Sequence, residues 1–318
     1  MQVSAEPLRK NFESVKGKLM KHYNLQIHTS AEAERFMTEC ETDFRTRLDG
    51  VVNAVLADDG LRTIALSGPT CSGKTTTADR LIEQIGASGH HAVVISVDDF
   101  FLDRNDRNRV DLAPPDYDSV EAIDLDYLDV FLRRLRNRES VLVPKYDFTA
   151  TRRVGYHEYL PDPLDIYVIE GIQAVYPEVT ARLGDYRSIF ISVTDDAEVN
   201  GVPFDRHEVR LLRRIVRDYN FRGATPEFSF HLWDGVRRNE EKNIFPNAGN
   251  CDFYLNSFLP YELFVLRKHA LPLLAQVPAE SVHRPSADRL TEKLAALPEL
   301  PFDGRRIPQN SVFREFIG

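Results

Sequence analysis

The chain has 318 residues, of which 42% are hydrophobic and 28% charged, and its formal net charge is −9 at pH 7. This composition is typical of a globular protein with one large core or two small ones, and the negative charge argues against a main role on nucleic acid or on an anionic membrane. Three scattered cysteines exclude a disulfide framework or a cysteine metal site.

The N-terminus carries no sign of a targeting segment. Residues 1–21 are charged throughout and lack the apolar core of a signal peptide, and no segment approaches the roughly 18 apolar residues of a membrane span. We therefore expect a cytoplasmic protein whose partner is a small-molecule substrate, with no membrane or nucleic-acid partner. A homo-oligomer is left open.

Residues 29–56 are predicted to form a long amphipathic helix. Thr29 and Glu32 are placed as a capping box at its start. Residues 7–22 are a weaker helix candidate, so we expect residues 1–57 to form a helical extension that packs on the main domain or on a second subunit. The apolar residues that recur at helical spacing are Phe36, Cys40, Phe44, Leu48, Val51 and Val55.

The stretch Gly68–Thr75 fits the phosphate-loop pattern G-x-x-x-x-G-K-[ST]. It follows an apolar strand at residues 63–66 and precedes a predicted helix at residues 76–85, which is the context that the motif requires. Glycines let the backbone of such a loop wrap a phosphate, and its N–H groups point at the anion. Lys74 would then meet the β- and γ-phosphates, and the Thr75 hydroxyl would meet Mg2+. An ordinary glycine turn before a helix is the alternative.

Three more apolar segments are predicted to be strands, at residues 91–97, 166–169 and 188–193. Strands that are apolar throughout and alternate with helices are typical of a parallel sheet covered on both faces. Between the first two we expect a helix at residues 119–138, a short strand at residues 141–143 and a loop at residues 144–159. The predicted fold is a doubly wound α/β domain, which binds its ligands beyond the carboxyl ends of the strands.

Acidic residues follow two of these strands. Asp98 lies at the carboxyl end of the strand at residues 91–97, where it could accept a proton from a substrate hydroxyl or orient it. Asp99 is an equally acidic neighbour, and alternation along the strand does not separate the two. Glu170 ends the strand at residues 166–169, where a carboxylate suits Mg2+ held directly or through water. The structural alternatives are a surface turn or a helix cap.

Residues 205–221 are predicted to form a helix crowded with arginine. Four side chains lie at i, i+3, i+4 and i+7 and so share one face, namely Arg210, Arg213, Arg214 and Arg217. A solvated face paired with acidic residues is the ordinary interpretation of such a run. Next to a phosphate loop, guanidinium groups also suit the charge on a transferring phosphoryl group.

The C-terminal third is less patterned. Its predicted elements are helices at residues 229–242, 261–274 and 286–296 and an edge strand at residues 251–255. The sequence shows no internal repeat and no low-complexity run, and no linker marks off a second domain.

Taken together, these motifs resemble the uridine kinase and phosphoribulokinase family, in the family's order, over about residues 60–225. The motifs that carry the resemblance are Gly68–Thr75, Ser96–Phe101, Asp116–Asp118, Pro144–Phe148, Val168–Ile172 and Arg210–Gly223. Beyond them, the chain looks like the longer bacterial proteins usually labelled uridine kinase-like nucleoside kinases. The segments concerned are residues 233–238, 244–246, 253–257, 261–263 and 307–318.

The resemblance implies an ATP-dependent phosphotransferase that moves the γ-phosphate of ATP to a hydroxyl, in nucleoside kinases the 5′-hydroxyl of the ribose, with ATP and Mg2+ as cofactors. The catalytic positions it implies are Asp98, Lys74 and Arg217. The nucleotide positions are Gly68, Thr70, Ser72, Gly73, Lys74, Thr75, Thr76 and Arg213. The substrate positions are Asp118, Tyr117, Tyr146, Phe148 and Arg222. The Mg2+ positions are Thr75, Asp98 and Glu170.

The same resemblance sets the expected domain organisation. A P-loop NTPase-type kinase domain occupies residues 58–280 and includes an arginine-rich lid at about residues 205–245. The N-terminal helical extension precedes it, and residues 281–318 form a C-terminal helix and a tail that pack on it.

Two positions depart from the uridine-cytidine kinase pattern. The chain has Thr151 where a base-contacting histidine is expected and Phe101 where a tyrosine is expected. Buried hydrogen-bond partners give a pocket strong discrimination, so the acceptor stays open. A uridine- or cytidine-like nucleoside is the first hypothesis, and another polyol, a sugar or a pantothenate-like acceptor is the alternative. A non-catalytic ATP-binding regulatory protein is a hypothesis from another class, but it does not require the acidic residues beside the loop.

Overall fold

The computed structural model describes residues 20–58, 60–103, 117–148 and 150–318. Its centre is a parallel five-stranded sheet in the order β10-β7-β2-β6-β3. The strands are β2 (Thr63–Ser67), β3 (His91–Ser96), β6 (Asp165–Glu170), β7 (Arg187–Ser192) and β10 (Phe253–Asn256). The predicted parallel α/β sheet is therefore confirmed, and the predicted edge strand does lie at an edge.

The strand that leads into the phosphate loop is the middle one of the five. All residues of β2 are buried, and it pairs with β6 on one side and β7 on the other. A central parallel strand loses water from both faces, which explains why its sequence is apolar throughout. Helix α4 (Lys74–Ala87) begins directly at the end of the loop.

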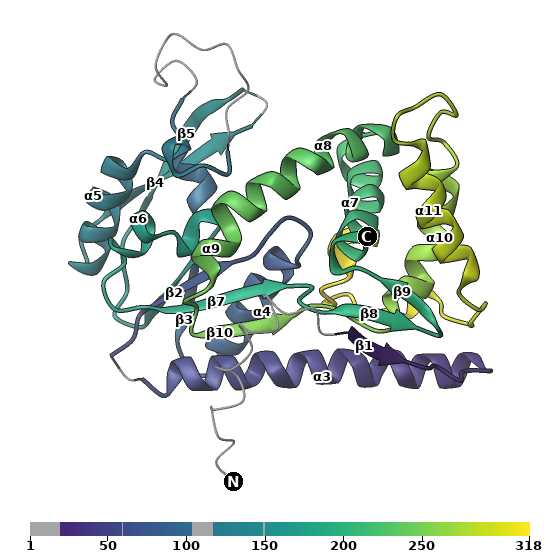
Figure 1. Cartoon of the computed structure of the whole chain (residues 1–318). Coiled ribbons are helices and arrows are strands. Elements are labelled where there is room, and N and C mark those ends of the chain that lie inside the picture. Colours follow the sequence, from purple (N-terminus) through teal and green to yellow (C-terminus); the bar gives the residue numbers. More distant parts are fainter. Residues whose placement is uncertain (1–19, 59, 104–116, 149) are drawn as a thin grey trace.

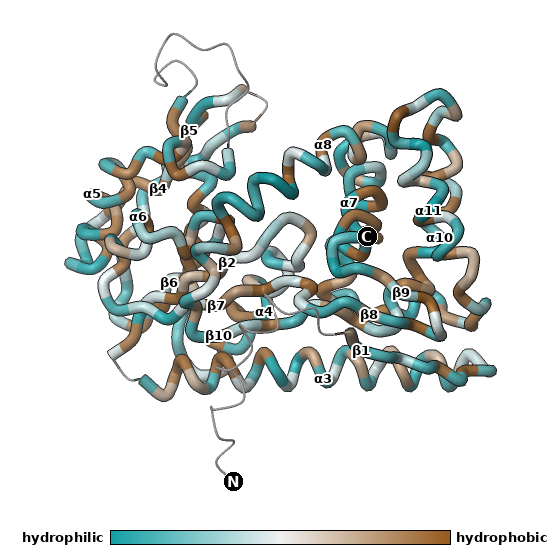
Figure 2. The backbone as a smooth tube through the Cα atoms, in the orientation of Figure 1, coloured by the Kyte–Doolittle hydropathy of each residue, from teal (hydrophilic) through white to brown (hydrophobic). Residues whose placement is uncertain are grey.

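Helix α3 (Ser30–Leu56) is the predicted N-terminal helix, and its capping box is present. The N–H of Glu32 donates to Thr29 Oγ1 at 3.2 Å, and the N–H of Thr29 donates to Glu32 Oε2 at 3.1 Å. The helix runs along one side of the molecule beneath the sheet (Figure 1) and alternates between hydrophobic and hydrophilic residues along its length (Figure 2). Its apolar side belongs to the same hydrophobic cluster as the sheet.

The helix candidate at residues 7–22 is wrong where it can be checked. Residues up to 19 lie outside the described part of the chain, and Met20–Tyr23 form a strand, β1, paired in parallel with β8 (Asp196–Val199). Strand β8 turns back into β9 (Val202–Phe204), which the sequence analysis missed. The turn between them has positive φ at Asn200 and Gly201, so the Asn-Gly pair was the signal for a hairpin.

The predicted loop at residues 144–159 is also wrong. Strands β4 (Val141–Asp147) and β5 (Arg152–Tyr159) form an antiparallel hairpin that stands apart from the central sheet (Figure 1). Most of the β5 side chains are exposed, so its sequence contains no apolar run from which a strand could be predicted. The helix expected at residues 119–138 is shorter: α5 spans Leu125–Arg136 and is capped by Asp124.

The second half of the chain is mainly helical. It contains α6 (Pro177–Thr180), α7 (Arg206–Arg222), α8 (Pro226–Asn239), α9 (Phe245–Ala248), α10 (Glu262–Leu274), α11 (Arg284–Ala296) and α12 (Arg314–Ile317). A π-helical turn, Glu240–Ile244, links α8 to α9, which is why the predicted helix at residues 229–242 is interrupted. No helix of the described ranges is both apolar enough and long enough to span a bilayer.

Candidate active site

A cleft of about 720 Å3 opens at the carboxyl ends of β2, β3 and β6. It brings together ten of the residues singled out from the sequence: Thr70, Lys74, Thr75, Asp98, Tyr117, Asp118, Phe148, Glu170, Arg217 and Arg222. Five further residues also line it, namely Cys71, Phe101, Gly171, Ile172 and Glu315. Residues from the phosphate loop, three strand ends, helix α7 and the C-terminal segment therefore meet in one place.

Two glycines of the phosphate loop are required by close contacts. A Cβ at Gly68 would lie 2.1 Å from the carbonyl oxygen of Ile191, and a Cβ at Gly73 would lie 2.1 Å from Val312 Cγ2. Gly73 also has φ near +93°, which favours glycine. The loop backbone consequently presses against β7 and the C-terminal segment and keeps its other side turned to the cleft, as a phosphate cradle requires.

The remaining predicted loop residues are placed differently. Ser72 is buried, and its Oγ has no hydrogen-bond partner among the described residues. Thr75 is exposed toward the cleft, whereas Thr76 is half-buried in the first turn of α4 and does not line the cleft. The Lys74 ammonium donates to the carbonyl of Pro69 at 3.3 Å, which holds its side chain back along the loop.

Asp98 and Glu170 lie on the same side of the sheet as Lys74. Asp98 sits in a 3-10 turn, Val97–Phe100, directly after β3, and Glu170 ends β6. Burial and the nearby Glu170 carboxylate raise the pKa of Asp98 to about 7, although Lys74 opposes the shift. Burial also raises the pKa of Glu170, again against the effect of Lys74. Two buried carboxylates beside one lysine are a site for further positive charge.

The two adjacent aspartates face different surroundings. Asp98 lines the cleft, whereas Asp99 does not. The Oδ1 of Asp99 accepts a hydrogen bond at 2.9 Å from the backbone N–H of Tyr146, which ties the turn after β3 to strand β4. The ambiguity that the sequence left open is therefore resolved in position: Asp98 is directed to the cleft and Asp99 to the hairpin.

Four aromatic rings form one wall at the far end of the cleft. Phe101, Tyr117, Tyr146 and Phe148 have ring centroids 5.1 to 6.3 Å apart. Tyr146 is buried behind the others, and its hydroxyl lies 3.3 Å from that of Tyr117. Phe148 is half exposed, which leaves a flat apolar surface open to a ligand.

Asp118 is held beside this wall by residues that the sequence analysis did not single out. Asn239, at the end of α8, donates to Asp118 Oδ2 at 3.3 Å, and the Tyr176 hydroxyl donates to the Asp118 carbonyl at 3.0 Å. Gln173 donates to the carbonyl of Tyr117. Gln173 and Tyr176 follow Glu170 by three and six residues, so their nearness in sequence to a strand end could have indicated that they belong to the site. No pattern in the sequence indicates that Asn239 belongs to it.

The arginines of α7 divide into two groups. Arg210 and Arg213 are buried behind the phosphate loop and donate to the carbonyls of Thr70 and Cys71, at 2.9 to 3.2 Å. Arg210 pairs with Glu240, and Arg213 pairs with Glu262 at 2.7 Å. Neither lines the cleft, so the structure places Arg213 as a support of the loop and not at the predicted nucleotide position.

Arg217 and Arg222 are the members of this helix that reach the cleft. Arg217 donates through Nε and Nη2 to Asp218, at 2.8 and 2.6 Å, and is nearly buried. Arg214 lies 3.2 Å from the same aspartate. The helix face is consequently neither a solvated surface nor a uniform arginine lid: one end is part of the core and the other end faces the cleft.

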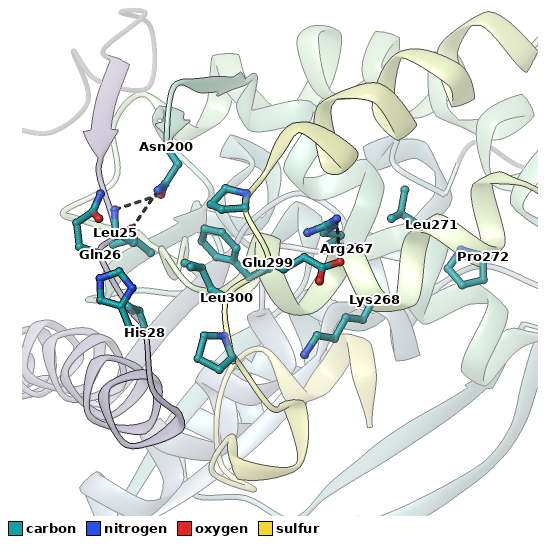
Figure 3. A pocket seen from close by; sticks show the side chains of 14 residues that line it. Leu25, Gln26, His28, Asn200, Arg267, Lys268, Leu271, Pro272, Glu299 and Leu300 are labelled. Carbon is teal, nitrogen blue, oxygen red and sulfur yellow. Dashed lines mark hydrogen bonds and ion pairs between the residues drawn. The ribbon is translucent and has the colours of Figure 1, made fainter.

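A second cavity, of about 910 Å3, lies away from the loop between the segment after β1, helix α10 and the C-terminal residues (Figure 3). None of the predicted site residues lines it. Several of its polar groups are already bonded: Asn200 exchanges two hydrogen bonds with the backbone of Leu25, and Arg267 donates to the carbonyl of Leu297 at 3.0 Å. We place the functional site at the smaller cleft because the charged groups gather there.

Comparison with known proteins agrees with this geometry. A model of the Phosphoribulokinase / Uridine kinase family matches residues 63–259. The chain belongs to this family. It is therefore an ATP-dependent phosphotransferase, and the phosphate loop, β6 with Glu170 and helix α7 all fall within the matched residues.

Several individual relatives are uridine kinases by name. A uridine kinase of Halobacterium salinarum is 32% identical over 193 residues, which are 60% of this chain and 78% of the relative. A uridine kinase of Staphylococcus epidermidis is 29% identical over 193 residues, 60% of this chain and 86% of the relative. A solved structure described as a possible uridine kinase from Bacillus stearothermophilus is 17% identical with a TM-score of 0.45, and the match covers 67% of this chain and 99% of that one.

Proposed function

We propose that this kinase transfers the γ-phosphate of ATP to the 5′-hydroxyl of a nucleoside of the uridine or cytidine type. The observation that supports this proposal most is that one cleft has two chemically different ends. Lys74, Thr75 and the loop backbone form an end suited to a triphosphate, and Asp118 with the aromatic wall forms an end suited to a sugar that carries a flat base. Asp98 lines the cleft together with both groups.

Asp98 is the residue we assign to the reacting hydroxyl. Without nucleotide or Mg2+, burial and Glu170 raise the pKa of Asp98 to about 7, and a bound Mg2+ would lower it and so favour the charged carboxylate that accepts a proton from a hydroxyl. Lys74 and Arg217 would stabilise the negative charge of the phosphoryl group as it moves. Arg217 is held in place by hydrogen bonds of 2.8 and 2.6 Å to Asp218, and Lys74 is held by one of 3.3 Å to the carbonyl of Pro69.

The residues present fit a magnesium ion. Thr75 offers a hydroxyl at the cleft, and Asp98 and Glu170 are buried carboxyls whose own pKa values are raised by burial. Oxygen ligands of this kind are those that Mg2+ takes, and the bound ion would neutralise phosphate charge. These three residues are our proposal for holding it.

The acceptor end favours a nucleoside over a bare sugar because the aromatic rings of Phe101, Tyr117 and Phe148 line it. Asp118 would accept hydrogen bonds from ribose hydroxyls, with Asn239 orienting its carboxylate. The departure at Phe101 favours a second candidate, a polyol or sugar acceptor: its ring is buried within the wall and has no hydroxyl to offer a base.

An acceptor panel distinguishes the two candidates. We expect kcat/KM to be highest for uridine or cytidine and at least about tenfold lower for ribose, glycerate and pantothenate, because only the nucleosides stack on the aromatic wall. Phe148→Ala removes the exposed part of that wall and should lower kcat/KM for nucleosides while leaving that for small polyols unchanged. A polyol that outperforms every nucleoside would reject the nucleoside assignment.

A further inference from the structure

The C-terminal segment, residues 310–318, packs against the phosphate loop although it lies outside the residues matched by the family model. The side chain of Val312 fills the space that a Cβ at Gly73 would need. Arg80 of helix α4 donates to the carbonyl of Asn310. The segment therefore touches both the loop and the helix that follows it.

Two aromatic rings anchor this segment. Phe313 and Phe316 are fully buried and belong to the hydrophobic cluster that also contains the sheet and α3. The ring of Phe316 lies 4.8 Å from the guanidinium carbon of Arg213, the arginine that supports the loop. Because Glu315 directly precedes Phe316, its backbone is fixed relative to the phosphate loop.

Glu315 lines the active-site cleft from this fixed position. Its Oε2 is buried and accepts no hydrogen bond from any described residue. A buried carboxylate oxygen without a donor costs free energy. Because this oxygen belongs to a residue that lines a ligand cleft, we expect a ligand of the cleft to supply the donor.

The charged groups near Glu315 place it at the phosphoryl end of the cleft. Burial raises the pKa of Glu170, and the negative charge of Glu315 adds to the rise. Burial acts to lower the pKa of Arg217, but neighbouring acidic groups that include Glu315 raise it. Glu170 is one of the residues assigned above to magnesium, and Arg217 is assigned to the moving phosphoryl group.

The chemistry of this end limits what the missing donor can be. An ionised phosphate has no hydrogen to donate and would be repelled by the carboxylates of Glu170 and Glu315. Two neighbouring carboxylates favour a divalent cation instead, and Mg2+ usually keeps several of its water ligands when it binds to protein and phosphate oxygens. Water ligands are hydrogen-bond donors, and the groups that accept from the ligands of a metal orient them.

We propose that Glu315 is a positioning residue for the magnesium ion of this kinase and accepts hydrogen bonds from water ligands of the ion. The proposal rests on the proposed magnesium site of Thr75, Asp98 and Glu170. It assigns a part in the reaction to a residue outside the stretch that the family model matches. The firm packing of the C-terminal segment on the loop then has a consequence, because it holds this carboxylate in a fixed place beside Glu170.

The test measures how far Mg2+ strengthens nucleotide binding by the full-length protein. Calorimetry gives the affinity for a non-hydrolysable ATP analogue in EDTA and in excess Mg2+, and the ratio of the two affinities measures the coupling. In the wild type we expect Mg2+ to strengthen binding. Glu315→Gln should reduce the ratio about tenfold or more, the effect of losing an outer-shell partner of a metal. Its affinity in EDTA should stay the same or rise, because one negative charge near the phosphates is removed.

Two further variants separate a metal effect from a structural one. Glu299→Gln is the matched control, since Glu299 is an exposed glutamate that pairs with Arg267 outside the cleft; it should keep the wild-type ratio. Val312→Ala loosens the same segment on the loop without removing a charge. It should weaken binding equally in EDTA and in Mg2+ and so leave the ratio unchanged.

The possible results have distinct meanings. An unchanged ratio in Glu315→Gln, or an equal loss of affinity in EDTA and in Mg2+, would overturn the proposal and leave the kinase assignment intact. A wild type whose nucleotide affinity does not respond to Mg2+ would overturn the proposed magnesium site, and this proposal with it.

Discussion

At the scale of single residues, the proposed chemistry depends most on Asp98. It is the acid that the sequence placed at a strand end and that the structure places in the cleft, whereas its neighbour Asp99 bonds to the hairpin backbone. Proton transfer by a positioned side chain contributes roughly 10²- to 10⁴-fold to rate. We expect Asp98→Asn to lower kcat by that order and to leave nucleotide affinity within a few-fold of the wild type.

Asp99→Asn is the comparison for that experiment. It should retain most of the turnover, with a modest loss of stability from the weakened bond to the Tyr146 N–H. Steady-state kinetics together with calorimetric binding of a non-hydrolysable ATP analogue measures both effects. If the two substitutions reduced kcat equally, the assignment of the proton acceptor to Asp98 would be wrong.

The raised pKa of Asp98 also predicts a pH dependence of stability. The pKa of Asp98 is about 7 in the folded protein, whereas the ordinary value is 3.8, so the folded state binds this proton more tightly than the unfolded state. Stability therefore falls as pH rises from about 4 to 7, and above pH 7 the charged carboxylate destabilises the protein in full. Asp98→Asn should therefore raise Tm at pH 8, and the gain should shrink as pH falls from 7 toward 4. Thermal unfolding of both proteins across this range, without nucleotide or Mg2+, measures it; a constant difference in Tm would contradict the shift.

At the scale of elements, the sequence revealed the parts whose patterns are local. The buried strands are apolar runs, and α3 carries a complete capping box, so both were predicted close to their observed bounds. Strand β5 was missed because most of its side chains are exposed, and β1 because its pairing with β8 joins segments 176 residues apart. Likewise, Asn239 and Glu315 reach the cleft through long-range packing, which no spacing in the sequence expresses.

Helix α7 shows how an element supports the site from behind. Arg213 is fully buried, pairs with Glu262 and donates to the loop carbonyl of Cys71. Removing one partner of a buried ion pair leaves an uncompensated charge and costs about 3–5 kcal/mol. We expect Glu262→Leu to lower the free energy of unfolding by that amount in urea denaturation, whereas Glu299→Leu, at an exposed pair, should change it by less than about 1 kcal/mol. Equal small effects would show that the buried pair does not stabilise the loop's support.

At the scale of the whole molecule, helix α3 and the C-terminal segment meet, and the C-terminal segment packs on the phosphate loop. Glu41 of α3 bonds both to Tyr261, just before α10, and to Ser311 of the C-terminal segment, and Val312 packs on Gly73. The N-terminal helix, the sheet and the last residues share one hydrophobic cluster. The loop is therefore supported by residues that lie far from it in the sequence, which motif analysis of residues 68–75 alone does not show.

This arrangement predicts that a change in the last residues reaches the nucleotide site. Val312→Ala removes two methyl groups from a buried contact, which should cost about 2 kcal/mol of unfolding free energy and weaken ATP binding by loosening the loop at Gly73. Urea denaturation and calorimetric titration measure the two effects. A loss of stability with unchanged ATP affinity would mean that the loop keeps its shape without this contact.

The central claim is that one cleft joins an ATP phosphate to the 5′-hydroxyl of a nucleoside beside Asp98. It is tested most directly by incubating the purified chain with Mg2+, ATP labelled at the γ-phosphate, and uridine or cytidine, and by determining where the label goes. We predict one nucleoside 5′-monophosphate for each ADP formed, and labelled nucleotide that forms at least about 100-fold more slowly with Asp98→Asn. Label recovered only as free phosphate, with the nucleoside unchanged, would contradict the account.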